Sequence, residues 1–251
     1  MDKINLKNNL KVLLKKQEIQ EKEYFIPYHW TIDKSSKIGR IYFGYIKNCI
    51  NLIKNLDKNI KILDAGCGDG RFLKELRDNN FNQVYGIDYS ERAINFAKIL
   101  TSHTNLKVCD IKNLPYNDNF FDVIFLIEVI EHIDPDEVNK IIKELDRVLK
   151  NSGKIIITVP SKNVSVQKKH FQHFSLSGLR GLLEPYFCIE NYFGYNKNNF
   201  ILDLIDRILN NKCFSLKFIF HWYNKKIWPK FFSLCEVNKG KQIIVSCKKN
   251  E

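Results

Sequence analysis

The sequence predicts an α/β fold built around a mostly parallel sheet. From about residue 58 onward, short apolar runs alternate with longer amphipathic segments, which is the pattern of strands joined by crossover helices. The first run, IKILDA, leads directly into the glycine-rich turn GCGDG. Such a turn lets the backbone approach a ligand closely at the start of a helix. The chain has 251 residues and is 44% hydrophobic, which suits one sizeable globular domain, or such a domain with an insertion.

Two helical segments are expected ahead of the sheet. Residues 1–23 favour a basic, mildly amphipathic helix, and the aromatic stretch YFIPYHW (24–30) follows it. A second helix is expected from about Ile38 to Leu56. We therefore assign residues 1–57 to an N-terminal helical cap.

Five apolar runs are expected to form buried strands. They cover residues 60–65, 83–88, 106–110, 121–127 and 154–160. The clearest helix between them follows Asp134, because apolar residues from Val138 to Leu149 recur there at helical spacing. Asp134 can cap the start of this helix, Pro135 suits its first turn, and Gly153 lies just beyond its end.

The C-terminal part combines a helix, an irregular region and a last strand. LSGLRGLLEPYF (176–187) favours a helix that runs into a further strand, and GKQIIVSCKK (240–249) favours the final strand. Between residues 196 and 239 the alternation breaks, and an amphipathic segment precedes a stretch that mixes aromatic residues with lysines. We assign residues 58–195 and 240–251 to the core and 196–239 to a helical insertion that acts as a lid or an interface.

Charge and cysteine usage limit the classes of partner and compartment. The net charge of +12 is compatible with RNA, an acidic membrane surface or a phosphorylated substrate, although the chain is generally rich in Lys, Asn and Ile. Seven cysteines are scattered without a C-x-x-C pair, which favours reduced thiols in a cytoplasmic protein. The N-terminus does not resemble a signal peptide, and no apolar run approaches the roughly 18 residues of a membrane span.

Acidic residues end the first three predicted strands. Asp64 precedes the glycine-rich turn, Asp88 ends the second strand, and Asp110 ends the third. Because the carboxyl ends of parallel strands share one edge of the sheet, these carboxylates are expected to face one crevice. A dinucleotide-binding G-x-G-x-x-G motif would need glycine where Arg71 stands, so an NAD site is disfavoured. An acid about 20 residues past the glycines can accept both hydroxyls of a ribose, and Asp110 could accept from an adenine amino group.

These motifs resemble those of the class I S-adenosylmethionine-dependent methyltransferases, in particular the type 11 subgroup that includes the ubiquinone-biosynthesis O-methyltransferases. The resemblance covers about residues 60–160 and rests on ILDAGCGDGRF, YGIDYS, CDIKNLPYNDNFFDVI, IEVIEHI and LKNSGKIIITVP. It implies a Rossmann-like, seven-stranded, mostly parallel sheet with an antiparallel last strand and helices on both faces. It also implies S-adenosylmethionine as the cofactor and in-line methyl transfer to a small-molecule acceptor, such as a lipid- or sugar-linked precursor.

The same resemblance implies a set of cofactor-binding residues. They are Arg40, Asp64, Gly66, Cys67, Gly68, Asp88, Tyr89, Asp110, Ile111 and Ile127. By this resemblance, Asp64 and the glycine turn would surround the methionine part of the cofactor, Asp88 the ribose, and Asp110 the adenine. Arg40 resembles an upstream arginine that reaches the methionine carboxylate in the ubiquinone enzymes.

The segment EVIEHI (128–133) carries a second group of candidates. If the segment is helical, Glu128, Glu131 and His132 share one face, which permits a site for Mg²⁺, Mn²⁺ or Zn²⁺ with a further ligand from His170 or His173. Metal binding, a general-base role for His132 and a positioning role are all open, and a bound metal is not the expected outcome. In this family a histidine–aromatic turn after the fifth strand often faces the acceptor, and His170, Phe171 and His173 resemble that turn. The catalytic candidates are His132, as a general base, and His173.

Two other functions and one surface contact follow from the same features. The 3′-terminal 2′-O-methyltransferases of small RNAs carry a similar E-x-x-E-H segment and bind a divalent metal, but no RNA-binding domain is evident, so nucleic acid is not the expected partner. A non-catalytic, cofactor-binding scaffold is disfavoured by the intact glycine turn and the three acids. The lysines and aromatics of residues 214–232 suit a peripheral membrane contact or an anionic substrate, or else a helix packed on the sheet.

Overall fold

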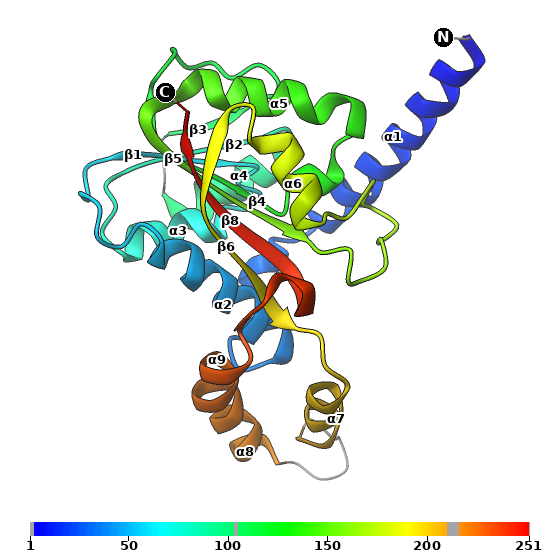
Figure 1. Cartoon of the computed structure of the whole chain (residues 1–251), viewed down its shortest axis with the longest axis vertical. Helices are drawn as coiled ribbons and strands as arrows, with labels where there is room; N and C mark the ends of the chain where they lie inside the picture. Colours follow the sequence, from blue (N-terminus) through cyan, green and yellow to red (C-terminus); the bar gives the residue numbers. More distant parts are fainter. Residues whose placement is uncertain (1–2, 103–104, 210–215, 251) are drawn as a thin grey trace.

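The computed structural model describes residues 3–102, 105–209 and 216–250, with side chains from residue 12 onward. Its centre is an eight-stranded sheet of order β3-β2-β1-β4-β5-β8-β6-β7 (Figure 1). The parallel part consists of β1 (Lys61–Ala65), β2 (Gln83–Asp88), β3 (Leu106–Val108), β4 (Phe121–Ile127) and β5 (Leu149–Pro160). The last strand, β8 (Gly240–Lys249), pairs antiparallel with both β5 and β6 (Phe187–Lys197).

This topology confirms the predicted Rossmann-like sheet with an antiparallel last strand. The difference is one short additional strand, β7 (Leu234–Cys235), which pairs with the outer edge of β6. β1 is buried along most of its length because helices cover both faces of the sheet, as expected for a parallel sheet.

Two layers of helices enclose the sheet. One face carries α2 (Lys37–Asn51), α3 (Arg71–Asp78) and α4 (Glu91–Thr101), and the other carries α5 (Pro135–Val148) and α6 (Leu176–Leu183). Asp134 caps α5 by accepting from the N–H of Asp136, as predicted. The helix ends well before Gly153, however, because Leu149 is fully buried and already pairs with Phe121 at the start of β5.

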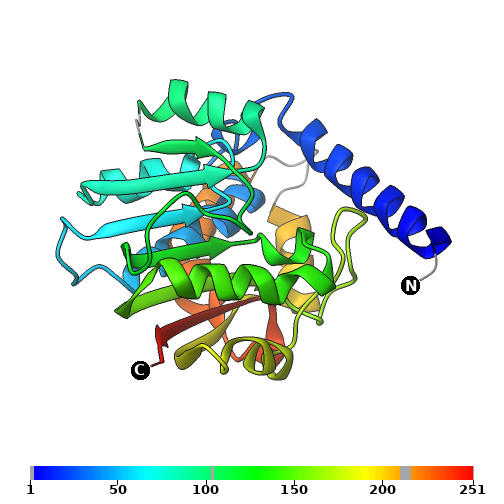
Figure 2. The same ribbon diagram turned by 90° about the horizontal axis from the view of Figure 1, so that it is seen from above.

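The N-terminal segment crosses the open edge of the sheet. Figure 2 shows α1 (Lys3–Glu23) running past the carboxyl ends of the parallel strands. Glu23 at its end forms an ion pair with Lys169, with Nζ–Oε distances of 2.8 and 2.9 Å. The 3₁₀ turn η1 (Tyr28–Trp30) follows, and its His29 Nδ1 lies 3.0 Å from Oδ1 of buried Asp69. The cap is therefore tied to the core at two separate places.

The insertion forms a separate helical group at the lower end of the molecule in Figure 1. It contains α7 (Phe200–Leu209), α8 (Lys217–Trp222), the π-helical turn η3 (Tyr223–Ile227), α9 (Trp228–Phe231) and the 3₁₀ turn η4 (Val237–Lys239). Buried Trp228 packs its ring edge on Tyr195 of β6, with ring centroids 5.6 Å apart. Within the described part of the chain, no helix combines the length and apolarity needed to cross a bilayer.

Candidate active site

A cavity of about 320 Å³ lies at the carboxyl ends of β1, β2 and β4, beneath α1. Nine of the ten predicted cofactor-binding residues line it, namely Asp64, Gly66, Cys67, Gly68, Asp88, Tyr89, Asp110, Ile111 and Ile127. The topology explains this convergence, because three consecutive crossovers return their strand ends to one edge. Residues of α1, η1 and α2 close the opposite side of the cavity.

The glycine turn is tight where it borders the cavity. Gly66 has a φ of +90° and Gly68 a φ of +52°, which is the region that favours glycine. A Cβ atom at Gly66 would lie 2.5 Å from Val129 Cγ2, and one at Gly68 would lie 2.7 Å from the Tyr24 hydroxyl. The backbone N–H groups of Gly66 and Cys67 both donate to the carbonyl of Ile87, at 2.8 Å. The turn therefore presents bare backbone to the cavity.

Asp88 is held by the backbone around it. Its two carboxylate oxygens accept from the N–H groups of Gly68 and Ser90, each at 2.9 Å. Burial raises the pKa of Asp88 to about 6, and these two hydrogen bonds oppose that rise. Each oxygen keeps a further lone pair, so the carboxylate can accept from two hydroxyl groups in the cavity.

Asp64 is a buried carboxyl group that lacks a partner. Its side chain is 2% exposed, and Oδ2 makes no hydrogen bond. Burial raises the pKa of Asp64 well above its usual value, and the neighbouring Asp88 raises it further. A positively charged group in the cavity would supply both the missing hydrogen bond and the missing charge. This site is therefore suited to an ammonium group.

Glu128 directly follows β4 and has a left-handed conformation, with a φ of +53°. Its N–H donates to the carbonyl of Thr158 at 3.0 Å, and the Thr158 hydroxyl donates to Glu128 Oε1 at 3.1 Å. Left-handed backbone at a residue other than glycine persists only where the surroundings impose it, and such positions gather at binding sites. Neighbouring β5 thus fixes the carboxylate in the cavity wall.

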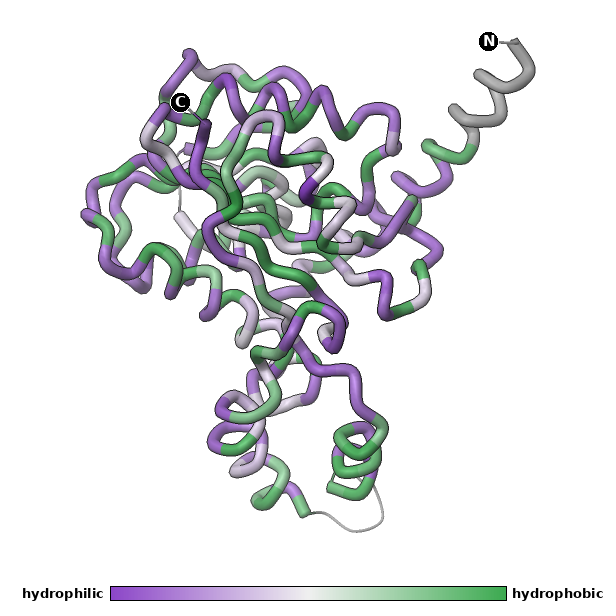
Figure 3. Tube along the Cα trace, viewed as in Figure 1, coloured by the Kyte–Doolittle hydropathy of each residue, from purple (hydrophilic) through white to green (hydrophobic). Residues whose placement is uncertain are grey.

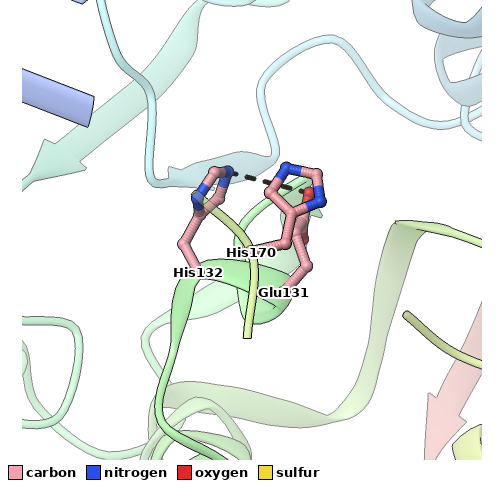
Figure 4. Close-up of side chains that lie close together, drawn as sticks. All are labelled: Glu131, His132 and His170. Carbon is pink, nitrogen blue, oxygen red and sulfur yellow. Dashed lines mark ion pairs between the residues drawn. The ribbon is translucent and has the colours of Figure 1, made fainter. Parts of the chain in front are cut away.

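Three side chains next to Glu128 form a compact cluster. Figure 4 shows Glu131 and His132, on the 3₁₀ turn η2 (Ile130–His132), pointing toward His170 from the loop after β5. Their potential ligand atoms all lie within 4.8 Å of one another. Glu131 is fully buried, and neither of its carboxylate oxygens has a hydrogen-bond partner. The predicted trio is thus rearranged, because His170 and not Glu128 completes the cluster.

The electrostatics of this cluster favour uncharged side chains. Burial raises the pKa of Glu131 well above its usual value, and the nearby Glu128 adds to the rise. Burial lowers the pKa of His132 to about 4 and that of His170 to about 3. Both imidazoles are therefore neutral at pH 7, so each has a free lone pair to accept a proton or bind a metal ion.

His173 lies behind His170, outside the cavity. Its Nδ1–H donates to the carbonyl of Val164 at 3.0 Å, because a carbonyl can only accept. In the neutral ring, Nε2 then accepts from Nδ1–H of His170, at 2.9 Å, and leaves Nε2 of His170 bare. His173 does not line the cavity, so the prediction that it acts on the acceptor does not fit its position.

Arg40 also lies away from its predicted place. It is buried between α2 and the insertion, where Nη2 donates to Asp206 Oδ2 at 2.8 Å and the guanidinium lies 4.7 Å from the centre of the Trp228 ring. Asp206 already neutralises the charge that was expected to reach a carboxylate, and Arg40 does not line the cavity.

The segment that covers the cavity is not the insertion at 196–239, which was expected to act as a lid or an interface. None of the described residues of this insertion lines the cavity, whereas α1, η1 and the link between them contribute Leu13, Gln17, Gln20, Glu23, Tyr24, Tyr28 and His29. The sequence signal for this cover was the aromatic stretch at 24–30, which holds two of the tyrosines.

His132→Asn should change the pH dependence of stability. The unfolded chain takes up a proton on His132 near pH 6.5, whereas the folded protein does so only near pH 4. The wild type therefore loses stability as the pH falls through this window, by up to about 3 kcal/mol relative to the variant. Urea unfolding between pH 7.5 and 4.5, with a chelator present, measures the difference. Parallel curves for the two proteins would contradict a buried neutral His132.

Comparison with known proteins agrees with the cavity and its motifs. A family profile described as a methyltransferase domain matches residues 63–157, from β1 into β5. Residues 63–157 are a methyltransferase domain. The resemblance inferred from the motifs is thus confirmed, and the cofactor of this family is S-adenosylmethionine.

Curated relatives of this methyltransferase domain match it only in part. An uncharacterized protein of Methanocaldococcus jannaschii is 34% identical over 120 residues, which are 47% of this chain and 49% of that protein. The ubiquinone biosynthesis O-methyltransferase of Pelagibacter ubique is 34% identical over 136 residues, covering 49% and 54%. A probable tRNA methyltransferase 9B of Bos taurus is 34% identical over 112 residues, covering 44% and 23%. The chain thus spans about half the length, or less, of these relatives.

Solved structures of methyltransferases share the fold. A SAM-dependent methyltransferase from Archaeoglobus fulgidus superimposes with a TM-score of 0.59 and 18% identity, covering 89% of this chain and 100% of that one. A geranyl diphosphate C-methyltransferase from Streptomyces coelicolor, in complex with Mg²⁺, geranyl diphosphate and S-adenosyl-L-homocysteine, gives a TM-score of 0.59 at 14% identity, covering 84% and 80%.

Proposed function

We propose that this protein binds S-adenosylmethionine in the cavity beneath α1 and transfers its methyl group to a small-molecule acceptor. The observation that supports this proposal is the convergence of nine cofactor-binding candidates on one cavity, beside a cluster of two neutral histidines and a glutamate. When bound, the sulfonium cofactor supplies an activated methyl group, so the protein mainly has to orient the acceptor behind it.

The residues at the carboxyl edge fit the parts of this cofactor. Unpartnered Asp64 Oδ2 would accept from the methionine ammonium group, and bare backbone at Gly66 leaves room beside it. Asp88 would accept from the ribose hydroxyls. Asp110 and Ile111, which line the same cavity, would border the adenine.

The histidine cluster would form the acceptor end. His132 is neutral, its Nδ1 has no hydrogen-bond partner, and it can accept a proton from an acceptor hydroxyl. His173 would act as a positioning residue, because its hydrogen bond fixes the ring of His170. Above the cluster, α1 is held by the Glu23–Lys169 ion pair, which favours an acceptor small enough to lie beneath a helix.

A divalent metal ion is the second role that this cluster supports. Unpartnered Glu131, with the free nitrogens of His132 and His170, offers one carboxylate and two imidazoles, a donor set that suits Zn²⁺ or Mn²⁺. A metal ion held there would polarise a hydroxyl of the acceptor. An RNA acceptor is the alternative substrate class, because some relatives are named as tRNA methyltransferases.

Release of S-adenosylhomocysteine tests both the reaction and the acceptor class. The purified protein should release it with small hydroxylated aromatic or lipid-linked acceptors and not with tRNA; release with tRNA alone would overturn the small-molecule proposal. Glu131→Gln and a chelator should each slow the reaction at least about tenfold if a metal acts there. Glu184→Gln, an exposed change on the far end of α6, is the matched control. Rates unchanged by both treatments exclude the metal.

A further inference from the structure

The insertion exposes an apolar face on α7. Phe200, Ile201, Leu204 and Ile208 are all exposed, and Phe200 is the most exposed at 76%. At 100° per residue these four positions fall within one arc of about 100°. They therefore form a continuous stripe along the outside of the helix.

A second apolar face lies on α8, which contacts α7. Phe218 is 84% exposed, and Ile219 and Trp222 are about half exposed. Their spacing of i, i+1 and i+4 places them on one side of the helix. Figure 3 shows hydrophobic colouring on both helices at the end of the molecule farthest from α5.

These exposed side chains are not what holds the insertion to the protein. The opposite sides of the same helices do so, through buried Leu202 and Asp206 of α7 and buried Phe220 of α8. Asp206 pairs with both Arg40 and Lys37 of α2, at 2.8 and 3.0 Å. The outward apolar stripe is therefore surplus to the packing of the fold.

Positive charge lies on the α8 side of this apolar surface. Residues 216–235 contain four lysines and no Asp or Glu. All four lysines, Lys217, Lys225, Lys226 and Lys230, are exposed. Exposed aromatic residues beside lysines are typical of segments that lie in a lipid interface, where the aromatics enter the acyl boundary and the lysines meet anionic headgroups.

We propose that α7 and α8 bind the surface of an anionic lipid bilayer. The ten residues of α7 are too short to span the hydrocarbon core, so the helix would lie in the plane of the interface. A second copy of the chain fits this surface less well, because a symmetric contact would bring the lysines of one copy against those of the other. Acidic headgroups supply the complementary charge.

Vesicle sedimentation with the full chain tests this proposal. The protein should bind vesicles of phosphatidylcholine with 30% phosphatidylglycerol, bind pure phosphatidylcholine weakly, and be released by 1 M salt. Lys225→Glu with Lys226→Glu should weaken binding by about 25-fold or more, because each lysine near such a surface contributes about fivefold. Phe218→Ser with Trp222→Ser should weaken it at least about tenfold.

Controls distinguish specific binding through this surface from nonspecific adsorption to vesicles and from loss of the folded state. Ile99→Ser and Lys98→Glu, both exposed on α4, should bind vesicles like the wild type. Every variant should retain calorimetric binding of S-adenosylhomocysteine. Absence of binding to anionic vesicles, or equal loss in the α4 controls, would overturn the proposal. The proposal would also be overturned if light scattering showed a dimer that dissociates in the Phe218→Ser, Trp222→Ser variant, since a second copy of the chain would then occupy the surface.

Discussion

Asp64→Asn is expected to lower the affinity for S-adenosylmethionine by about 10- to 100-fold while making the cofactor-free protein more stable. The affinity falls because the amide cannot replace a carboxylate as partner of an ammonium group, and a hydrogen bond to a charged group contributes about 1.5–3 kcal/mol. Stability rises because the unpartnered buried carboxyl group must either carry a charge or retain a proton that the unfolded chain releases, and an amide of the same shape does neither. Calorimetric titration and urea unfolding measure the two effects.

The stability gain should depend on pH in a defined direction. The pKa of Asp64 is raised by folding, so the folded protein retains a proton that the unfolded chain loses near pH 4. Wild-type stability therefore falls as the pH rises through this range, and the advantage of the Asn variant grows with pH. Asp78→Asn, on the exposed end of α3, should change neither property. If Asp64→Asn bound S-adenosylmethionine as tightly as the wild type, the inference that Asp64 contacts the ammonium group would be wrong.

Gly66→Ala should destabilise the protein by about 2–4 kcal/mol and abolish cofactor binding. Alanine disfavours a φ of +90°, and its methyl group would lie 2.5 Å from Val129 Cγ2. The displaced turn also loses the backbone surface that faces the cavity. Thermal unfolding and calorimetric titration are the measurements.

Gly181→Ala provides a matched control for the glycine turn. Gly181 lies within α6, and no neighbouring atom would lie within 4 Å of its Cβ. Alanine there should stabilise the protein by about 0.5–1 kcal/mol, because it favours the helix. The two glycine substitutions are thus expected to act in opposite directions. If Gly66→Ala melted at the same temperature as the wild type, the turn would tolerate a side chain, contrary to its observed geometry.

The sheet and its carboxyl edge could be predicted from sequence because their signals are local. Each strand is an apolar run, and Asp64, Asp88 and Asp110 lie at the carboxyl ends of three of these runs. Topology alone then brings the three acids to one side of the sheet. Gly66 and Gly68 signal their own conformation, since few other residues adopt it.

The parts that escaped prediction depend on contacts between distant segments. Arg40 is paired with Asp206, 166 positions away, and nothing near Arg40 in sequence announces that partner. His170 and His173 lie on the same loop after β5, and the sequence does not show which ring faces Glu131. In the structure His173 bonds to the distant carbonyl of Val164, and His170 is the ring beside Glu131. The role of α1 as the cover rests on its docking to Lys169 after β5, which its weak amphipathic pattern does not reveal.

Helix α2 serves two regions of the molecule at once. Tyr42, Tyr45 and Ile46 on one side of it line the cavity, while Lys37 and Arg40 near its start hold α7. Both sets of contacts lie on one continuous helix of 15 residues, so a shift of the insertion that displaces α2 would also displace one wall of the cavity. The insertion contributes no described residue to that cavity, yet it is connected to one wall of the cavity through α2.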